Sequence, residues 1–327
     1  MTIGPEDATT RTLGLLLIDG FALMSYASIV EPFRAANSLS GRTLYRWTHL
    51  SVAGPVARAS NGTAIVVDSQ VGAPLSCDTL FVFAGGDPRA FDGSRTLDWL
   101  RGAARGGMAI AGVSGGPYIL ARAGLLHGFR ATIHWEHAEA FREDFPEVEL
   151  ASGLYVIDRR RMTCAGGVAG LDLAIALIAH DHGPALAGRV SEWFIRTEQR
   201  QAEGPQRLSL RERWGVRPDA VLRALADMEA AIEEPRSREH LAREAGVSVR
   251  QLERLFRGHL GSTIGQAYLK VRLEHADRLL RTTGLTVTAV ALASGFTSAS
   301  HFARVFRQAY GHAPAARPKS EARRADR

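Results

Sequence analysis

The sequence predicts an α/β fold, with a doubly wound and mostly parallel sheet, followed by an all-α domain with two helix-turn-helix units. Short apolar runs alternate with stretches of helical periodicity through the first two thirds of the chain. In the last third one pattern occurs twice, as GVSVRQLERLFR at 246–257 and GFTSASHFARVFR at 295–307. A length of 327 residues and a hydrophobic content of 46% are enough for two domains that each bury a core.

Strands and helices alternate in the first part. The apolar runs predict strands at residues 11–18, 47–54, 79–84, 108–113 and 131–133, and a hairpin at 153–157 and 162–165. The stretches between them predict helices at 22–37, 94–105, 117–123 and 171–180. Such alternation places helices on both faces of a largely parallel sheet.

The composition argues against a membrane segment, a metal and a disulfide. The apolar run Leu13–Ile18 has the length of a strand and is far too short to span a bilayer. Cys77 and Cys164 are the only cysteines, and their separation fits neither a zinc site nor a disulfide framework. We therefore expect a soluble, cytoplasmic protein that holds no metal and no cofactor.

We expect a sensor-like domain at 1–196, a linker at 197–217, a helical domain at 218–318 and a basic tail at 319–327. The proposed linker is polar and contains Gly204-Pro205. In the helical domain a helix near 219–232 precedes the first repeat, and a long helix near 263–282, capped by Ser262 or Thr263, connects the two repeats.

The excess positive charge lies entirely on the helical part. Residues 218–327 contain 18 Lys and Arg against 12 Asp and Glu, whereas residues 1–217 contain 22 of each. A domain that faces a polyanion is expected to carry such an excess. The alternative is a solvated basic surface that has no partner.

Each repeat fits a helix, a Gly turn and a second helix that would enter the major groove of DNA. Ser248 and Ser298 precede the second helices as N-caps. The predicted DNA contacts are Val249, Arg250, Gln251, Arg254 and Arg257 in the first copy and Ala299, Ser300, His301, Arg304 and Arg307 in the second.

Side-chain chemistry divides these contacts into two kinds. Arg can bond guanine, and Gln adenine, at two points. Arg257, Arg307 and Lys270 are better placed for phosphates, which add affinity without sequence information. Alternatively, Arg254 or Arg304 forms a structural ion pair, and His301 is a surface residue without a role in DNA binding.

Segment 236–315 resembles an AraC/XylS-type DNA-binding domain. The resemblance is carried by LAREAGVSVRQLERLFR, VRLEHADRLLRTT and VALASGFTSASHFARVFRQAYGHAP. It implies a seven-helix unit with two reading helices, promoter double-stranded DNA as a partner, and activation of transcription through contact with RNA polymerase.

The turn Gly-Val-Ser-Gly-Gly at 112–116 matches the G-x-S-x-G pattern of a nucleophile elbow. A serine hydrolase would also need a histidine base and an acid. His134, His180, Asp158 and Asp172 follow in the sequence, but their spacing does not order them as a triad.

Residues 13–195 resemble a PfpI-type, class I glutamine amidotransferase-like domain, and the whole chain is similar to the GlxA-type branch of AraC-family regulators. The resemblance is carried by EPFRAAN at 31–37, FVFAGG, GVSGGPYILARAGLLHGFRATIHWEH and TCAGGVAGLDLAIALIA. Enzymes of this kind place a cysteine at the elbow, an acid from the first helix and a histidine downstream. Here Ser114 stands at the elbow, Ser25 at the position loosely aligned with the acid, and His134 at that of the histidine, which implies a ligand pocket without catalysis.

Ligands of open α/β sheets bind beyond the carboxyl ends of the strands. The residues expected around that crevice are Asp19, Gly85, Gly86, Asp87, Ser114, Gly115, His134, Trp135 and Glu136. Trp135 could meet an ammonium group, with Glu136 or Asp87 offsetting its charge, unless Trp135 is a core aromatic and His134 a structural residue. The small molecule favoured is a zwitterion, either an amino acid or a betaine such as glycine betaine or carnitine.

These observations favour a ligand-responsive transcription activator that forms a homodimer and controls catabolism of amino acids or betaines, as the resemblance implies. The first alternative is a hydrolase or amidase that uses Ser114 and is fused to a DNA-binding module. The second is a nucleoid-type DNA binder whose first domain only dimerises.

Overall fold

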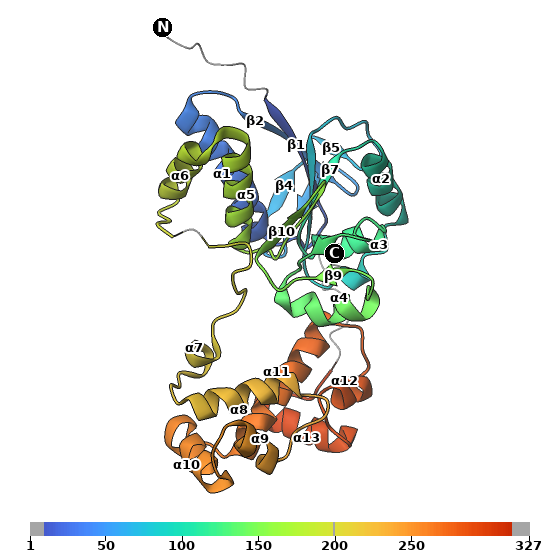
Figure 1. Cartoon of the computed structure of the whole chain (residues 1–327). Coiled ribbons are helices and arrows are strands. Elements are labelled where there is room, and N and C mark those ends of the chain that lie inside the picture. Colours follow the sequence, from blue (N-terminus) through green and yellow to red (C-terminus); the bar gives the residue numbers. More distant parts are fainter. Residues whose placement is uncertain (1–9, 199, 316–327) are drawn as a thin grey trace. The chain divides into compact units, whose positions relative to one another are not determined.

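The computed structural model describes residues 10–198 and 200–315 (Figure 1). The chain divides into two compact units between Gln206 and Arg207. The predicted basic tail at 319–327 lies outside the described residues. No helix among the described residues is long and apolar enough to cross a membrane.

The first unit is built on a seven-stranded sheet, as the alternation of strands and helices predicts. Every neighbouring pair in it is parallel except β10 and β11, which form the predicted hairpin. In sheet order the strands are β10 (Tyr155–Asp158), β11 (Arg161–Cys164), β7 (Ala109–Ser114), β6 (Thr79–Ala84), β1 (Arg11–Leu17), β2 (Tyr45–Ser51) and β5 (Ser69–Gln70).

Helices cover both faces of this sheet, which confirms the doubly wound fold class. Leu15, Phe81 and Val113 pack on one face against α1 (Leu23–Ser40), α5 (Ala169–His182) and α6 (Pro184–Trp193). On the other face Leu16 and Val82 pack against α2 (Ser94–Arg105), α3 (Gly116–Arg122) and α4 (Ala138–Asp144). Alternate residues of one strand point to opposite faces, so a strand buried on both sides is a continuous apolar run.

Several short elements had no sequence prediction. They include α4 and α6, the β3–β4 hairpin (Val56–Arg58 and Ala64–Val66), strand β9 (Glu149–Leu150), and the 3₁₀ turns η1 (Pro88–Ala90) and η2 (Trp135–His137). The strand predicted at 131–133 is instead β8 (Arg130–Ala131), a two-residue strand that pairs with β9 outside the main sheet. Elements of two or three residues are too short to show a period in the sequence.

The segment predicted as a linker is folded in both of its halves. Before the division point, Ala202 O accepts a hydrogen bond from Leu154 N–H at 2.7 Å. After it, α7 (Leu210–Trp214) begins at a capping box of Ser209 and Glu212 and packs Leu210 and Trp214 on the helical core. The structure therefore starts the helical unit at Arg207 rather than at residue 218.

The helical unit contains α8 (Asp219–Ala230), α9 (Arg238–Glu244), α10 (Val249–Leu260), α11 (Ile264–Thr282), α12 (Val287–Ala293) and α13 (Ala299–Tyr310). Pro218 is the N-cap of α8. Thr263, not Ser262, caps α11 through a capping box with Gln266. The two repeats are the helix pairs α9–α10 and α12–α13.

Candidate ligand site and nucleic-acid interface

Ser114 occupies a sharp turn between β7 and α3. The φ of Ser114 is +61°, which lies in the left-handed region that few residues other than glycine adopt. Ser114 is 8% exposed. The flanking glycines are required by close packing. A Cβ on Gly112 would lie 2.6 Å from the backbone nitrogen of Pro117, and a Cβ on Gly116 would collide with the carbonyl oxygen of Val82. The elbow geometry is thus kept although its residue is a serine.

Ser25 and Gly166 surround Ser114, although the three are far apart in the sequence. A Cβ on Gly166 would lie 2.6 Å from Ser114 Cβ and 2.8 Å from Ser25 Oγ. Ser25 Oγ accepts a hydrogen bond from Gly167 N–H at 2.7 Å, and Ser28 Oγ donates one to Gly167 O at 2.7 Å. The place aligned with an acid therefore holds a hydroxyl that orders the start of α5.

The ends of β1, β6 and β7 meet beside this turn. A Cβ on Gly85 would lie 2.6 Å from Gly20 O, and Gly115 N–H donates to Ala84 O at 2.9 Å. Gly86 follows with a φ of +62°. The structure thus brings the predicted glycines together with Ser114 at the carboxyl edge of the sheet.

The two predicted carboxylates at this edge each bind backbone. Asp19 Oδ1 accepts from Arg58 N–H at 2.8 Å. Asp87 Oδ1 accepts from Arg89 N–H at 3.0 Å and so caps η1. Both side chains therefore order loops at the carboxyl edge of the sheet.

His134, Trp135 and Glu136 form a compact cluster at η2. His134 Nδ1 accepts from Glu136 N–H at 3.3 Å, and its ring lies 5.6 Å from that of Trp135. Burial lowers the pKa of His134, and the nearby Glu136 charge offsets part of that effect. Among the described residues no hydrogen bond joins His134 to Ser114, so the histidine is not placed as a base for that hydroxyl.

Asp172, one of the acids considered for a triad, is committed elsewhere. Its side chain is 1% exposed and pairs with Arg196 and, at 2.5 Å, with Arg200. Neither arginine was singled out in the sequence, because the segment after α6 has no periodicity that marks a contact. Asp172 thus holds the chain that leaves α6 rather than serving Ser114.

The reading helices begin as the repeat predicts. Ser248 and Ser298 each accept a hydrogen bond from the backbone N–H three residues later, at Gln251 and His301. The two copies differ beyond that bond. Gln251 Oε1 also accepts from Ser248 N–H at 3.0 Å, which completes a capping box. His301 instead sets its ring 5.9 Å from that of Phe296.

The predicted DNA contacts lie on the outward face of α10 and α13. Leu252 and Phe256, like Phe302, Val305 and Phe306, are buried in the hydrophobic cores, and Leu255 is half-buried against the first of these cores. Val249 and Ala299 are half-buried. The exposed members are Arg250, Gln251, Arg254, Arg257, Ser300, His301, Arg304 and Arg307.

The arginines on these helices differ in their partners. Arg257 Nε lies 3.6 Å from Glu253 Oε1, one helical turn away. Within the described part of the chain, no ion pair involves Arg254 or Arg304, and both side chains are exposed. The structural ion pair considered for these two positions is therefore absent there, and their guanidinium groups are available to a ligand.

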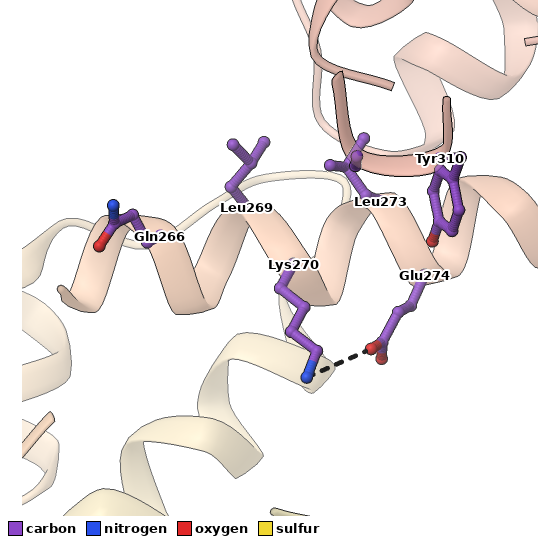
Figure 2. A pocket seen from close by; sticks show the side chains of 7 residues that line it. Gln266, Leu269, Lys270, Leu273, Glu274 and Tyr310 are labelled. Atoms are coloured by element: carbon purple, nitrogen blue, oxygen red, sulfur yellow. Dashed lines mark ion pairs between the residues drawn. The ribbon is translucent and has the colours of Figure 1, made fainter. Parts of the chain in front are cut away.

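Lys270 lines a groove along α11, and its side chain is 60% exposed. Figure 2 shows it beside Glu274, with Leu269, Leu273 and Tyr310 along the same groove. Its Nζ is 3.9 Å from Glu274 Oε1 and 4.7 Å from the centre of the Trp214 ring. A phosphate contact by Lys270 would have to compete with both interactions.

Residues 13–180 match the DJ-1/PfpI family, and residues 241–317 match a helix-turn-helix domain family. The chain is similar over its whole length to regulators with both parts. It is 42% identical to the HTH-type transcriptional regulator GlxA of Rhizobium meliloti over 96% of this chain and 97% of that protein. It is also 42% identical to the HTH-type transcriptional regulator CdhR of Pseudomonas aeruginosa over 91% of this chain and 89% of that protein.

A solved structure resembles the first unit. An AraC family transcriptional regulator from Pseudomonas putida is 26% identical, with a TM-score of 0.50, over 56% of this chain and 99% of that one. The comparisons agree with the division of the molecule into a sheet-based unit and a helical one.

Proposed function

Because this chain belongs to the HTH-type transcriptional regulators that join a DJ-1/PfpI domain to an AraC-type DNA-binding domain, we propose that its first unit is a non-catalytic receptor. The receptor takes a small zwitterionic metabolite, an amino acid or a quaternary amine. The helical unit reads promoter DNA through α10 and α13. Bound metabolite shifts the population of states that activate transcription, with RNA polymerase as the partner and a homodimer as the working form.

The surroundings of Ser114 carry the non-catalytic part of the proposal. A hydroxyl near its normal pKa needs an adjacent base to become a nucleophile. In the described contacts, the neighbours of Ser114 are Ser25 and Gly166, neither of which is a base. The two other candidates are bonded elsewhere: His134 to Glu136 N–H, and Asp172 to two arginines. The site retains the shape of a nucleophile elbow without the acid and base that would make it react.

The cluster at η2 supports a cationic group on the effector. Trp135 is aromatic and Glu136 is acidic, and both kinds of side chain attract a cationic group. Since burial lowers the pKa of His134, that ring stays neutral at physiological pH and does not repel a cation. The start of α5, a helix of 14 residues that begins beside Ser114, would favour a carboxylate.

Exposed arginines support the DNA-binding part. Arg254 and Arg304 occupy equivalent places in the two repeats, and neither has an ion pair within the described residues. The DNA-binding part of the proposal is tested by letting the full-length protein select duplexes from a random library. We expect enriched duplexes to share two short motifs about one helical turn apart. A protein that enriches no sequence over random competitor at physiological salt would refute the proposal.

The receptor part is tested by thermal shift of the full-length protein with a panel of L-arginine, other amino acids, glycine betaine and carnitine. We expect at least one zwitterion to raise the unfolding temperature. No shift with any member would leave the first unit as a dimerisation block only.

The substitution Ser114→Ala separates receptor from enzyme. We expect the variant to bind the stabilising zwitterion within about fivefold of wild type, since one hydroxyl contributes about 1 kcal/mol to binding. Its transcriptional response in a reporter strain should persist. A turnover of the zwitterion by the wild-type protein that Ser114→Ala abolishes would favour the hydrolase alternative instead.

A further inference from the structure

The helical unit has two separate hydrophobic cores that share one helix. Ile264, Tyr268 and Val271, from the first half of α11, pack with α8, α9 and α10. Leu273 and Leu279, from its second half, pack with α12 and α13. We call these the first and second modules. Each carries one reading helix, and hydrophobic packing alone would leave their relative angle to the bending of α11.

Tyr268 fastens α11 to a loop of the first module. Its hydroxyl donates to Ala231 O and accepts from Arg236 N–H at 3.1 Å. The residue is 6% exposed, so both bonds are shielded from water. They hold the two ends of the loop between α8 and α9, residues 231–236, at a fixed place on α11.

Arg272, one turn further along α11, fastens the turn of the second module. Its Nε donates to Ser294 O at 2.9 Å and its Nη2 to Gly295 O at 2.7 Å. Its guanidinium lies 4.0 Å from the centre of the Phe296 ring.

The first module has the equivalent bond. Arg223 Nη2 donates to Ala245 O at 2.9 Å, over the same separation of 22 residues as between Arg272 and Ser294. Each module thus holds its own turn with an arginine from its first helix, so the internal repeat comprises three helices rather than two.

Gly295 joins the two modules directly. Its φ is +75°, and a Cβ there would collide with Ile232 O and lie 2.8 Å from Pro235 Cγ. The turn before α13 therefore touches the loop before α9. This contact, together with the bonds of Tyr268 to the same loop, is here called the junction.

We propose that the junction sets the angle and distance between α10 and α13, and so determines which spacing of two half-sites the protein accepts. This inference rests on the proposed function, in which both helices read one duplex. An inserted base pair turns one half-site by about 34° relative to the other, since a helical turn has about 10.5 base pairs. A rigid pair of modules loses contacts at the second half-site, whereas a loosened pair adapts.

Two variants each weaken one part of the junction, and Tyr268→Phe does so without altering any group that Arg272 bonds. Tyr268→Phe deletes only the hydroxyl. Gly295→Ala drives the turn away from Ile232 and Pro235. Tyr310→Phe, a tyrosine of the same unit outside the junction, serves as the matched control.

The experiment measures the affinity of the full-length proteins for three duplexes: the selected one, the same with one base pair inserted between the half-sites, and a single half-site. We expect the insertion to weaken wild type and Tyr310→Phe by about tenfold or more, a loss comparable to that of a mismatched base pair. Tyr268→Phe and Gly295→Ala should lose about threefold or less, because loosened modules keep most of the second contact. All four proteins should bind the half-site alike.

Two results overturn the inference in different ways. An insertion penalty in both junction variants equal to that of wild type, with half-site binding intact, refutes the junction and leaves the proposed function standing. Failure to select any duplex with two contacted segments removes both. If Gly295→Ala binds no half-site because its turn is disrupted, Tyr268→Phe by itself decides between these results.

Discussion

Equivalent residues of the two repeats make different contacts. Gln251 and His301 both follow an N-cap serine by three positions, yet Gln251 closes a capping box through its carboxamide oxygen, whereas His301 packs beside Phe296. Gln251 would have to release Ser248 before it could bond adenine with both groups. Within the described residues, the arginines one turn later have no ion pair, so we propose Arg254 and Arg304 as the first candidates for base recognition.

We predict that Arg254→Ala or Arg304→Ala weakens binding to the selected operator by about 1–3 kcal/mol and relaxes the base preference at one position. Each removes a guanidinium that can bond guanine at two points. Fluorescence anisotropy at one fixed salt concentration measures the loss on matched and mutated operators.

Arg257→Ala provides the comparison at a position we assign to phosphates. Its loss should be about equal on all duplexes, because phosphates carry no sequence information. A loss from Arg254→Ala that is equally uniform would reassign Arg254 to the phosphates.

His137 gives the first unit a pH-dependent stability. Burial, with the charges of His134 and Arg89, lowers its pKa to about 4. An unfolded histidine titrates near 6.5, so the unfolded state takes up the proton first as the pH falls. The stability that the neutral ring contributes is complete above about pH 6.5 and is lost progressively toward about pH 4.

We predict that the free energy of unfolding of the first unit falls by about 2 kcal/mol from this residue between about pH 7.5 and about pH 5. Urea unfolding at the two pH values measures it, and His137→Gln should flatten the dependence. His180→Gln should not, because the His180 side chain is 81% exposed. An unchanged pH dependence in His137→Gln would contradict the assignment.

At the scale of elements, the segment between α6 and the helical unit is held at both ends. Arg196 and Arg200 pair with the buried Asp172 near its start. At its end Gln206 Nε2 donates to Ile133 O at 3.0 Å and to Gly153 O at 2.8 Å. Ile133 directly precedes the candidate ligand cluster at η2, so the segment that leads to the helical unit is bonded beside the proposed effector site.

We predict that Asp172→Asn destabilises the first unit by about 2–4 kcal/mol, because it leaves the charge of Arg196, a side chain 15% exposed, without its carboxylate. Arg200 contributes less, since its side chain is 41% exposed. Urea unfolding of the full-length protein measures the change.

Glu31→Gln is the surface control for this substitution. It breaks a pair with Arg34 in which both side chains are 43% exposed, so the stability should change by less than about 0.5 kcal/mol. An equally small effect of Asp172→Asn would show that the buried pairs do not hold the segment.

At the scale of the whole molecule, the two units have separate cores. The first unit packs helices on both faces of its sheet, and the second packs around α11. Units with separate cores unfold as separate cooperative transitions when few contacts cross between them.

We predict that calorimetry of the full-length protein resolves two unfolding transitions. The zwitterion found in the panel should raise the transition temperature of the first unit only. At about 100 times its Kd, it should add about 2.7 kcal/mol to the stability of that unit. A selected operator duplex should raise only the other transition. A single transition that both additions raise together would show that the units unfold as one.

The sequence by itself determined the features that depend on near neighbours. The repeat, its serine caps and the apolar faces of α10 and α13 follow from spacings of three and four residues, which a helix imposes locally. The bounds of β6 and α2 also match the predicted ranges, because each is a periodic run between glycines or other turn residues. The position of the elbow follows from its glycines, which the close approach of α3 to Val82 requires.

Only the tertiary structure decided which distant residues meet. Three contacts join residues that are far apart in the sequence. Ser25 and Gly166 lie beside Ser114, Arg196 pairs with Asp172, and Gly295 lies against Pro235. Such pairs form because two cores bring their elements together, and neither a buried charge pair nor a glycine at a close approach leaves a period in the sequence. The surroundings of Ser114 and the contact between the two modules of the helical unit were therefore decided by tertiary contacts, which spacing along the chain does not reveal.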